Sequence, residues 1–265
     1  MQTVCRNFHA TVAAQDNLAG LSATFGDTVA EKIMETKKSV GGSDFLGKFA
    51  QLVEGMGGGA IGRKRAKEIV VKDTEVLKSG DIWGRIEALT EIMDGDKERA
   101  RDIVEQNPQV LGSADLQGRF GELTEIMGGD KERARGILER NPQAALTAAN
   151  IMRKFGELVE ICGSEAGARA LVEQTCAVFK GAHPKKNFDG WVEIFGDRDA
   201  ALAHLQRAPS ILETAQPKKK FDELVLLKGG SEATRAQVLV LLSKRPNLLT
   251  NMTAARNSLG ATSSE

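Results

Sequence analysis

The chain has 265 residues and carries 36 Lys and Arg against 36 Asp and Glu, so its formal net charge is zero. Hydrophobic residues make up 41% and charged residues 27% of it, which is typical of a folded globular protein and excludes a wholly disordered chain. The charge balance gives no support to a strongly basic nucleic-acid- or membrane-binding protein, and three cysteines exclude a disulfide framework and favour a reducing compartment.

The first 44 residues are expected to form an N-terminal extension. Residues 1–15 hold a single charged residue and are too short and too weakly amphipathic for an organellar presequence. A degenerate repeat is expected from Leu18, because the apolar residues from Leu18 to Phe25 and the Gly26-Asp27 step after them have the spacing of the clearer repeats downstream.

Six similar units follow over residues 45–253, and their first apolar residues are separated by 37, 34, 35, 33 and 33 residues. In each unit apolar residues recur at i, i+3 and i+6 or i+7, which is one face of an α-helix, and a second such stripe follows. The leading apolar residues are Phe49, Ile86, Phe120, Phe155, Phe188 and Phe221.

A Gly-Asp or Gly-Ser step separates the two stripes of most units. Gly adopts the left-handed conformation that ends a helix, and the Asp or Ser side chain caps the next helix. Acidic residues that suit the helix dipole then follow at Glu98, Glu132, Glu165 and Glu232. Prolines that stop the second helix, or start a further short turn, stand at Pro108, Pro142 and Pro209.

The repeats predict an all-α protein, specifically an α-solenoid of six to seven stacked helix hairpins of about 34 residues each. One hairpin cannot bury its apolar stripe alone, so neighbouring hairpins must build the core together. Residues 254–265 are small and polar and are expected to form a C-terminal tail. The longest unbroken apolar run, Val238 to Leu242, is far too short to cross a bilayer, so no transmembrane segment is predicted.

The segment Gly57–Gly62 contains a Gly-x-Gly-x-x-Gly pattern, followed by Arg63-Lys64. A dinucleotide site needs this pattern between a strand and a helix, and a P-loop needs a Lys followed by Ser or Thr. Here the pattern follows a predicted helix, so we interpret it as a long flexible turn between two helices. Phosphate binding by the basic residues after it is the minor alternative.

Histidines and cysteines indicate no catalytic or metal site. His204 takes a core-facing repeat position, and His9 and His183 fall in predicted loop or tail. A catalytic base needs a nucleophile within reach and a group to orient it, and no Cys and His spacing matches a zinc site. Cys162 and Cys176 are interpreted as small packed side chains, with a redox pair as the alternative. We therefore expect a protein that is not an enzyme and has no cofactor.

Basic residues recur just before the leading apolar residue of every unit. Stacked units place equivalent positions in a column, so these residues form a basic ladder, our candidate site for a protein partner or a nucleic acid. Cations at the start of a helix oppose its dipole, so helix stability does not explain them. The basic ladder consists of Lys48, Arg85, Arg119, Arg153, Lys154, Lys185, Lys186, Lys218, Lys219 and Lys220.

A parallel acidic column stands five residues after each leading apolar residue, which favours a mixed-charge edge over a nucleic-acid groove. Pairs such as Arg153–Glu157 and Lys185–Asp189 are also spaced i, i+4. Aromatic residues for base stacking are scarce, because the core stripe uses them. The acidic column consists of Glu54, Glu91, Glu125, Glu160 and Glu193.

The units that end in Pro followed by paired aliphatics, such as Pro108 with Val110-Leu111 and Pro209 with Ile211-Leu212, resemble the repeat of the mitochondrial transcription termination factor family. The resemblance covers roughly residues 45–253. It implies two-helix units followed by a short helical turn, a location in mitochondria or plastids, and binding of DNA or RNA along a basic concave face. The ladder residues are the positions to which that binding role carries over.

Similar helical arrays also serve as assembly subunits of large organellar complexes. The sequence therefore leads us to expect a non-catalytic scaffold or assembly subunit that binds protein partners in a photosystem, a respiratory complex or a ribosome. An organellar nucleic-acid-binding factor that uses the basic ladder is the alternative. The partner itself, the organelle and the binding face stay open.

Overall fold

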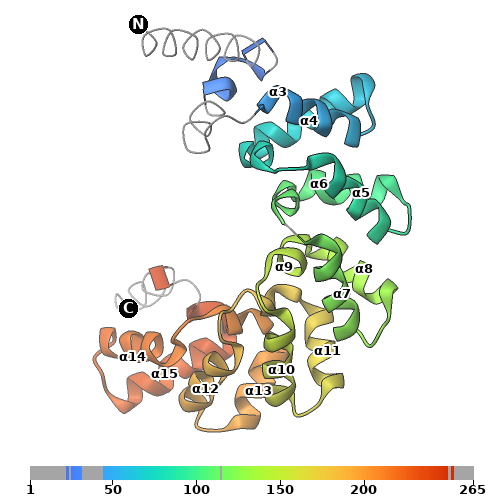
Figure 1. Ribbon diagram of the computed structural model, residues 1–265. Coiled ribbons are helices and arrows are strands. Elements are labelled where there is room, and N and C mark those ends of the chain that lie inside the picture. Colours follow the sequence, from blue (N-terminus) through green and yellow to red (C-terminus); the bar gives the residue numbers. More distant parts are fainter. Residues whose placement is uncertain (1–21, 24, 32–43, 114, 250–251, 254–265) are drawn as a thin grey trace, which may run out of the picture. The chain divides into compact units, whose positions relative to one another are not determined.

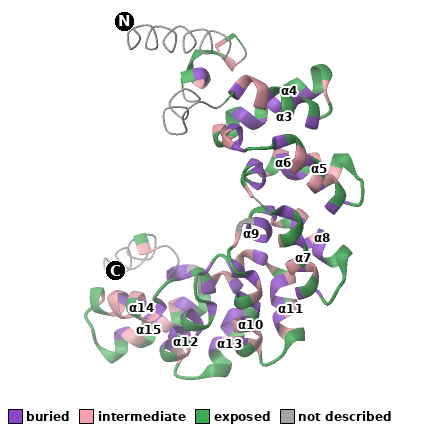
Figure 2. Cartoon of the chain, in the orientation of Figure 1, coloured by how far each residue is buried: buried purple, intermediate pink, exposed green. Residues whose placement is uncertain are grey.

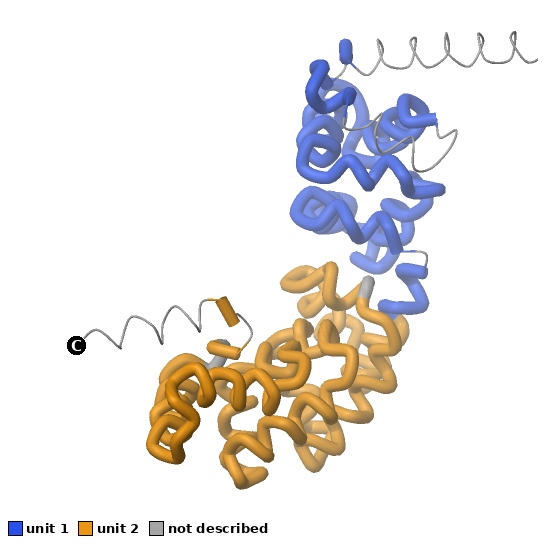
Figure 3. Tube along the Cα trace, turned by 90° about the vertical axis from the view of Figure 1, so that its left-hand side faces the viewer, with its two compact units in different colours: residues 1–120 blue, residues 121–265 orange. Residues whose placement is uncertain are grey.

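The computed structural model describes residues 22–23, 25–31, 44–113, 115–249 and 252–253 (Figure 1). The described residues contain helices and no strand, so the predicted all-α class is confirmed. They group into two compact units, residues 1–120 and 121–265 (Figure 3). The start of the expected degenerate repeat and the tail from residue 254 lie outside the described residues.

Unit 1 contains two helix hairpins, each closed by a short 3₁₀ helix, and the beginning of a further helix, α7. Phe25 packs its ring edge-on against Phe49 at a centroid distance of 4.7 Å, so the described part of the N-terminal segment contacts the first hairpin. The elements are α3 (Phe45–Gly55), α4 (Gly59–Lys72), η1 (Thr74–Lys78), α5 (Ile82–Ile92), α6 (Lys97–Gln106), η2 (Pro108–Gly112) and α7 (Leu116–Ile126), which crosses the division between the units.

Unit 2 continues the same order of two helices and a short third element. Pro108 and Pro209 each begin a 3₁₀ helix and Pro142 begins a short α-helix, so the expected extra turn after the proline is confirmed. The elements are α8 (Lys131–Arg140), α9 (Pro142–Thr147), α10 (Ile151–Cys162), α11 (Glu165–Gln174), η3 (Cys176–Phe179), α12 (Pro184–Phe195), α13 (Arg198–Arg207), η4 (Pro209–Glu213), α14 (Pro217–Leu227), α15 (Glu232–Lys244) and η5 (Pro246–Leu249).

The caps of the second helices are those that the sequence predicts. Gly129, Gly163 and Gly196 have φ of 89°, 74° and 72°, the left-handed region that ends a helix. The following Asp or Ser accepts a hydrogen bond from a backbone N–H in the first turn of the next helix. These caps are Asp96, Asp130, Ser164, Asp197 and Ser231.

Elements of the same kind pack on one another within each unit. In unit 1, α3 contacts α5, α4 contacts α6 and η1 contacts η2; in unit 2, α10 contacts α12, α12 contacts α14 and η3 contacts η4. The buried residues lie between these elements (Figure 2), and the largest fully buried side chain is that of Trp191. The hairpins that these contacts join therefore bury their apolar stripes against one another.

Arginines of the second helices tie consecutive hairpins together. Each donates to a backbone carbonyl at the C-terminal end of the preceding hairpin's first helix, where the helix leaves carbonyls unpaired and the dipole favours a cation. The sequence analysis missed this role, although an arginine recurs in the second helices, after an alanine at Arg101 and Arg169. The donor–acceptor pairs are Arg101 to Gly55 at 3.0 Å, Arg169 to Ile126 at 2.7 Å, Arg198 to Ile161 at 2.8 Å and Arg235 to Ile194 at 3.2 Å.

The glycine-rich segment is an inter-helix turn, as expected, but a shorter one than predicted. Helix α4 already begins at Gly59, so only Met56, Gly57 and Gly58 lie between α3 and α4. Gly62 is buried inside α4, where an added Cβ would lie 2.4 Å from the carbonyl oxygen of Val53. The last glycine of the pattern thus allows two helices of one hairpin to approach closely, which is a packing role.

We expect Gly62→Ala to lower the free energy of unfolding by about 1–3 kcal/mol, the usual cost of overpacking, because backbone must move. Gly156→Ala is the matched control, since Gly156 in α10 has nothing within 4 Å of an added Cβ. There alanine is expected to raise stability by about 0.5–1 kcal/mol. Urea unfolding of both variants measures the difference, and a neutral or stabilising Gly62→Ala would contradict the close approach.

Candidate functional site

The innermost residue of the basic ladder is the one directly before each leading apolar residue. It joins the first helix of its repeat to the third element of the same repeat. Its side chain donates to a backbone carbonyl at the end of the short third element, where the 3₁₀ turn leaves carbonyls without a partner. This contact explains why a cation stands at the start of these helices. The donors and acceptors are Lys48 to Lys78 at 3.4 Å, Arg85 to Leu111, Lys154 to Phe179 at 2.5 Å and Lys220 to Leu249 at 3.3 Å.

Two repeats vary this contact. Asn187 takes the position in α12, is buried, and donates from Nδ2 to the Leu212 carbonyl at 2.7 Å. Arg119 occupies the same position in α7 and also interacts with another part of the chain. An amide can replace a cation here because the position requires only a hydrogen-bond donor. A backbone carbonyl accepts from a neutral donor as well as from a charged one.

Lys154 is the most enclosed residue of the basic ladder, with only 6% of its surface exposed. Burial, and to a smaller extent the neighbouring charge of Arg153, lowers the pKa of Lys154, while Glu157 opposes the shift. Its ammonium group is committed to the Phe179 carbonyl. Lys154 is therefore a structural residue in this conformation and is not presented to a partner.

The outer ladder residues lie two or three positions before the leading apolar residue and all belong to unit 2. Arg153 pairs with Glu157 and donates to the Ala182 carbonyl at 3.0 Å, and Lys185 lies 3.7 Å from Glu160. The expected i, i+4 pairs Arg153–Glu157 and Lys185–Asp189 are both present, the second at 3.8 Å. These cations are thus interleaved with carboxylates.

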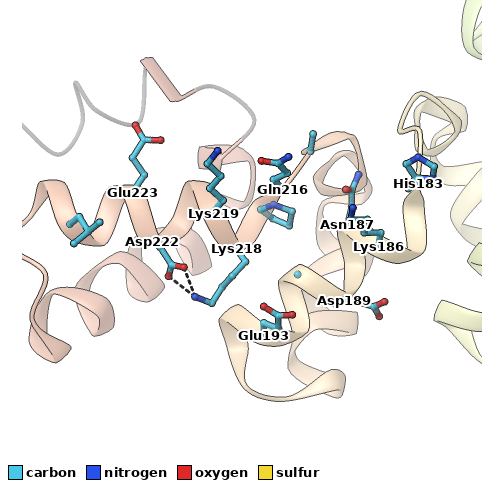
Figure 4. A pocket seen from close by; sticks show the side chains of 14 residues that line it. His183, Lys186, Asn187, Asp189, Glu193, Gln216, Lys218, Lys219, Asp222 and Glu223 are labelled. Atoms are coloured by element: carbon cyan, nitrogen blue, oxygen red, sulfur yellow. Dashed lines mark hydrogen bonds and ion pairs between the residues drawn. The ribbon is translucent and has the colours of Figure 1, made fainter.

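Lys186 and Lys219 are the outer ladder residues that have no ion-pair partner among the described residues. Both are exposed and line a hollow of about 850 Å³ between α12 and α14 (Figure 4). Lys218 also lines it and pairs with Asp222 at 2.5 Å. The same hollow is lined by Asp189, Glu193, Asp222 and Glu223. Its charge is therefore mixed, which suits a protein surface better than a polyanion.

The first helices of the two units start differently. In α3, α5 and α7 an Asp caps the helix and accepts from the N–H of a Gly three residues later, at 2.9, 2.8 and 2.8 Å. The cap has no side-chain hydrogen bond in α10, α12 and α14, where cations follow instead. Gly is needed in unit 1 because a Cβ on Gly47 would lie 2.0 Å from Asp44 Oδ2. Unit 1 consequently presents carboxylates and glycines where unit 2 presents cations.

An aromatic groove that the sequence analysis missed lies along the first helices of unit 1. Trp83, at the second position of α5, is 42% exposed and lines two hollows of about 480 and 320 Å³. A third hollow of about 330 Å³ shares Glu87 and Glu91 with the second. The sequence held no signal for it, because a tryptophan three residues before Ile86 has the i, i+3 spacing of the buried stripe.

The remaining candidates for chemistry are packed side chains. His204 is buried against Trp191 and Phe195, at ring-centroid distances of 5.3 and 4.9 Å, which confirms the core-facing position that the repeat predicts. Among the described residues no group of His, Cys, Asp and Glu has the arrangement of a metal site. His9 and Cys5 lie outside the described residues.

Both described cysteines are free thiols with raised pKa values. Burial raises the pKa of Cys162, and it raises the pKa of Cys176 from 9.0 to about 12 against a smaller opposing effect of Lys180. A thiol is a nucleophile only as a thiolate, so this direction favours the packing role over the redox alternative.

The Cys176 pKa predicts a pH dependence of stability. Since the folded pKa lies above the unfolded one, the thiol's contribution is complete below pH 9 and is lost as the pH rises toward 12. Between about pH 8 and about pH 10.5 we expect the wild type to lose about 2 kcal/mol more than Cys176→Ala. Urea unfolding at the two pH values measures this, and equal losses would show that the thiol titrates normally.

No family model, curated protein or solved structure matches the chain. The resemblance to the mitochondrial transcription termination factor repeat therefore stays an expectation. In the part of the chain that the structure describes, no helix has the length and apolar character needed to cross a membrane.

Proposed function

We propose that the chain is an α-solenoid of stacked hairpin repeats that acts as a non-catalytic scaffold or assembly subunit and binds protein partners in a large complex. The observation that carries the proposal is that the innermost and the outer residues of the basic ladder have different contacts. The innermost ladder residues close their own repeats, and the outer ones are interleaved with carboxylates. What faces outward is a mixed-charge surface with an exposed aromatic groove, which suits protein partners.

The stacked-repeat arrangement draws support from the packing within each unit. Like elements contact like elements, and arginines of four following hairpins each donate to the end of the preceding hairpin's first helix. Repeats of this kind present long surfaces and bind through them. An organellar host, such as a photosystem, a respiratory complex or a ribosome, is part of the proposal and rests on the family resemblance alone.

The alternative, an organellar nucleic-acid-binding factor, rests on Lys186 and Lys219, the exposed ladder residues that have no ion-pair partner among the described residues. A phosphate-binding track loses affinity steeply with salt, and each lost phosphate contact lowers that slope by about one. Lys186→Glu with Lys219→Glu is therefore the variant that tests the alternative. The innermost Lys220 is left intact, because its contact to Leu249 belongs to the fold.

The deciding experiment is the native size of the particle that carries the protein in its own cells, measured with and without nuclease. We expect a particle far larger than the monomer that nuclease leaves unchanged, and the Lys186→Glu, Lys219→Glu variant should still enter it. A particle that shrinks under nuclease and excludes the variant would reject the scaffold and favour the nucleic-acid factor. A monomer in both conditions would reject both functions.

A further inference from the structure

We infer that the groove around Trp83 binds a partner segment in which an arginine stands beside an apolar residue. The inference rests on the proposed scaffold function and names the chemistry of one of its partners. It concerns only α3, α5 and the neighbouring residues of α6 and α7 in unit 1.

The three hollows of unit 1 form one continuous surface because they share residues. Trp83 lines the hollow of about 480 Å³ along α3 and the one of about 320 Å³ between α3, α5 and α6. The hollow of about 330 Å³ adjoins the second through Glu87 and Glu91. Beside Trp83, the hollow along α3 is also lined by the exposed Ala50.

The charge of this surface favours a cationic partner. Glu54 and Glu87 are exposed and have no ion-pair partner among the described residues, and Glu91 accepts only from the amide of Gln117. Of the cations nearby, Arg101 is already bound to Glu98 and to the Gly55 carbonyl. Arg85 is bound to the Leu111 carbonyl. Lys97 is therefore the one uncommitted cation in these linings, which hold four carboxylates: Glu54, Glu87, Glu91 and Asp115.

An exposed indole between carboxylates is suited to a guanidinium group. Arginine stacks on the face of tryptophan more often than lysine does, and its planar fork donates to carboxylates at the same time. Ala50 and the rim of the indole offer apolar contact to a neighbour of that arginine. Buried tryptophan and arginine contacts are also the ones that dominate protein–protein affinity.

Unit 2 shows that this surface is not a general property of the repeat. At the position of Trp83, three residues before the leading apolar residue, α12 has Lys185 and α14 has Lys218. At the position of Gly47 and Gly84 the same helices have Lys186 and Lys219. An arginine-bearing segment is therefore expected to bind unit 1 more tightly than the corresponding mixed-charge surface of unit 2.

The two tryptophans allow a direct test on the full chain. Trp191 is fully buried, so fluorescence that acrylamide quenches comes mainly from Trp83. The probes are capped peptides in which arginine and leucine are adjacent, two apart or four apart, with matched peptides that carry glutamine or glutamate instead of arginine. We expect an arginine peptide to protect Trp83 from acrylamide and to bind at least about tenfold more tightly than its glutamine counterpart, which is ~1.4 kcal/mol.

Isosteric variants separate recognition from folding. Glu87→Gln with Glu91→Gln should weaken the arginine peptide about tenfold, a loss of ~1.4 kcal/mol. Glu193→Gln, at the repeat position of Glu91 but in unit 2, is the matched control and should bind as the wild type does. Higher salt should weaken binding to the wild type more than binding to the double variant.

The peptide experiments would overturn the inference if no arginine peptide protected Trp83 from acrylamide. Equal binding of the arginine and glutamine peptides would also overturn it, as would equal binding of the arginine peptide by the wild type and the Glu87→Gln, Glu91→Gln variant. Protection of Trp83 that grows with protein concentration in the absence of peptide would assign the groove to a second copy and would also overturn it. A large nuclease-resistant particle combined with any of these results would reject the groove and leave the scaffold function standing.

Discussion

Replacing Ile194 by alanine is expected to lower the free energy of unfolding of unit 2 by about 2–5 kcal/mol, whereas Leu227→Ala is expected to cost under about 1 kcal/mol. Both residues stand six positions after the leading apolar residue of their helix. Ile194 is 1% exposed, because the following hairpin packs on α12 and its Arg235 donates to the Ile194 carbonyl. Leu227 is 59% exposed, since no described hairpin follows α15.

The emission of Trp191, buried in unit 2, follows this unfolding in urea. Ile161→Ala serves as a second buried example, since Ile161 takes the same position in α10 and is 2% exposed. It should behave like Ile194→Ala. Equal losses at Ile194 and Leu227 would mean that another chain, or a part of this one, covers the last hairpin in solution.

Reversing the charge of Lys154 is expected to cost about 3 kcal/mol, the order of magnitude for a buried charge left without its partner. A carboxylate at this place would face the Phe179 carbonyl and stand beside Glu157, both of which repel it. Lys186→Glu, in the outer part of the basic ladder, is expected to change the free energy of unfolding by no more than about 0.5 kcal/mol, because Lys186 is exposed.

The same urea unfolding compares the two variants, with Lys154→Met as a further control. Methionine keeps the length of the side chain but removes the donor, so it should cost about 1 kcal/mol, the net value of a hydrogen bond. If Lys154→Glu unfolds like the wild type, the ammonium group is not committed to the Phe179 carbonyl. Lys154 would then be available to a protein or nucleic-acid partner, as the sequence predicts for the basic ladder.

The basic ladder shows how far repeat reasoning reaches. The sequence placed a cation before each leading apolar residue and showed that helix stability does not explain it. The acceptor was out of reach, because each carbonyl belongs to a residue about 25 to 30 positions later, such as Phe179 for Lys154 and Lys78 for Lys48. Only a folded repeat brings the start of its first helix to the end of its third element.

The sequence alone was sufficient to predict the local structure. This includes the helix pairs, the Gly-Asp and Gly-Ser steps between them, the caps such as Asp130 and the core position of His204. Those features depend on neighbours within one helical turn, so their pattern can be seen in the printed chain. Burial depends on neighbours from other repeats, and this is why equivalent residues such as Ile194 and Leu227 differ in exposure. The exposure of Trp83 and the commitment of Lys154 arise in the same way, from contacts that only packing between distant segments creates.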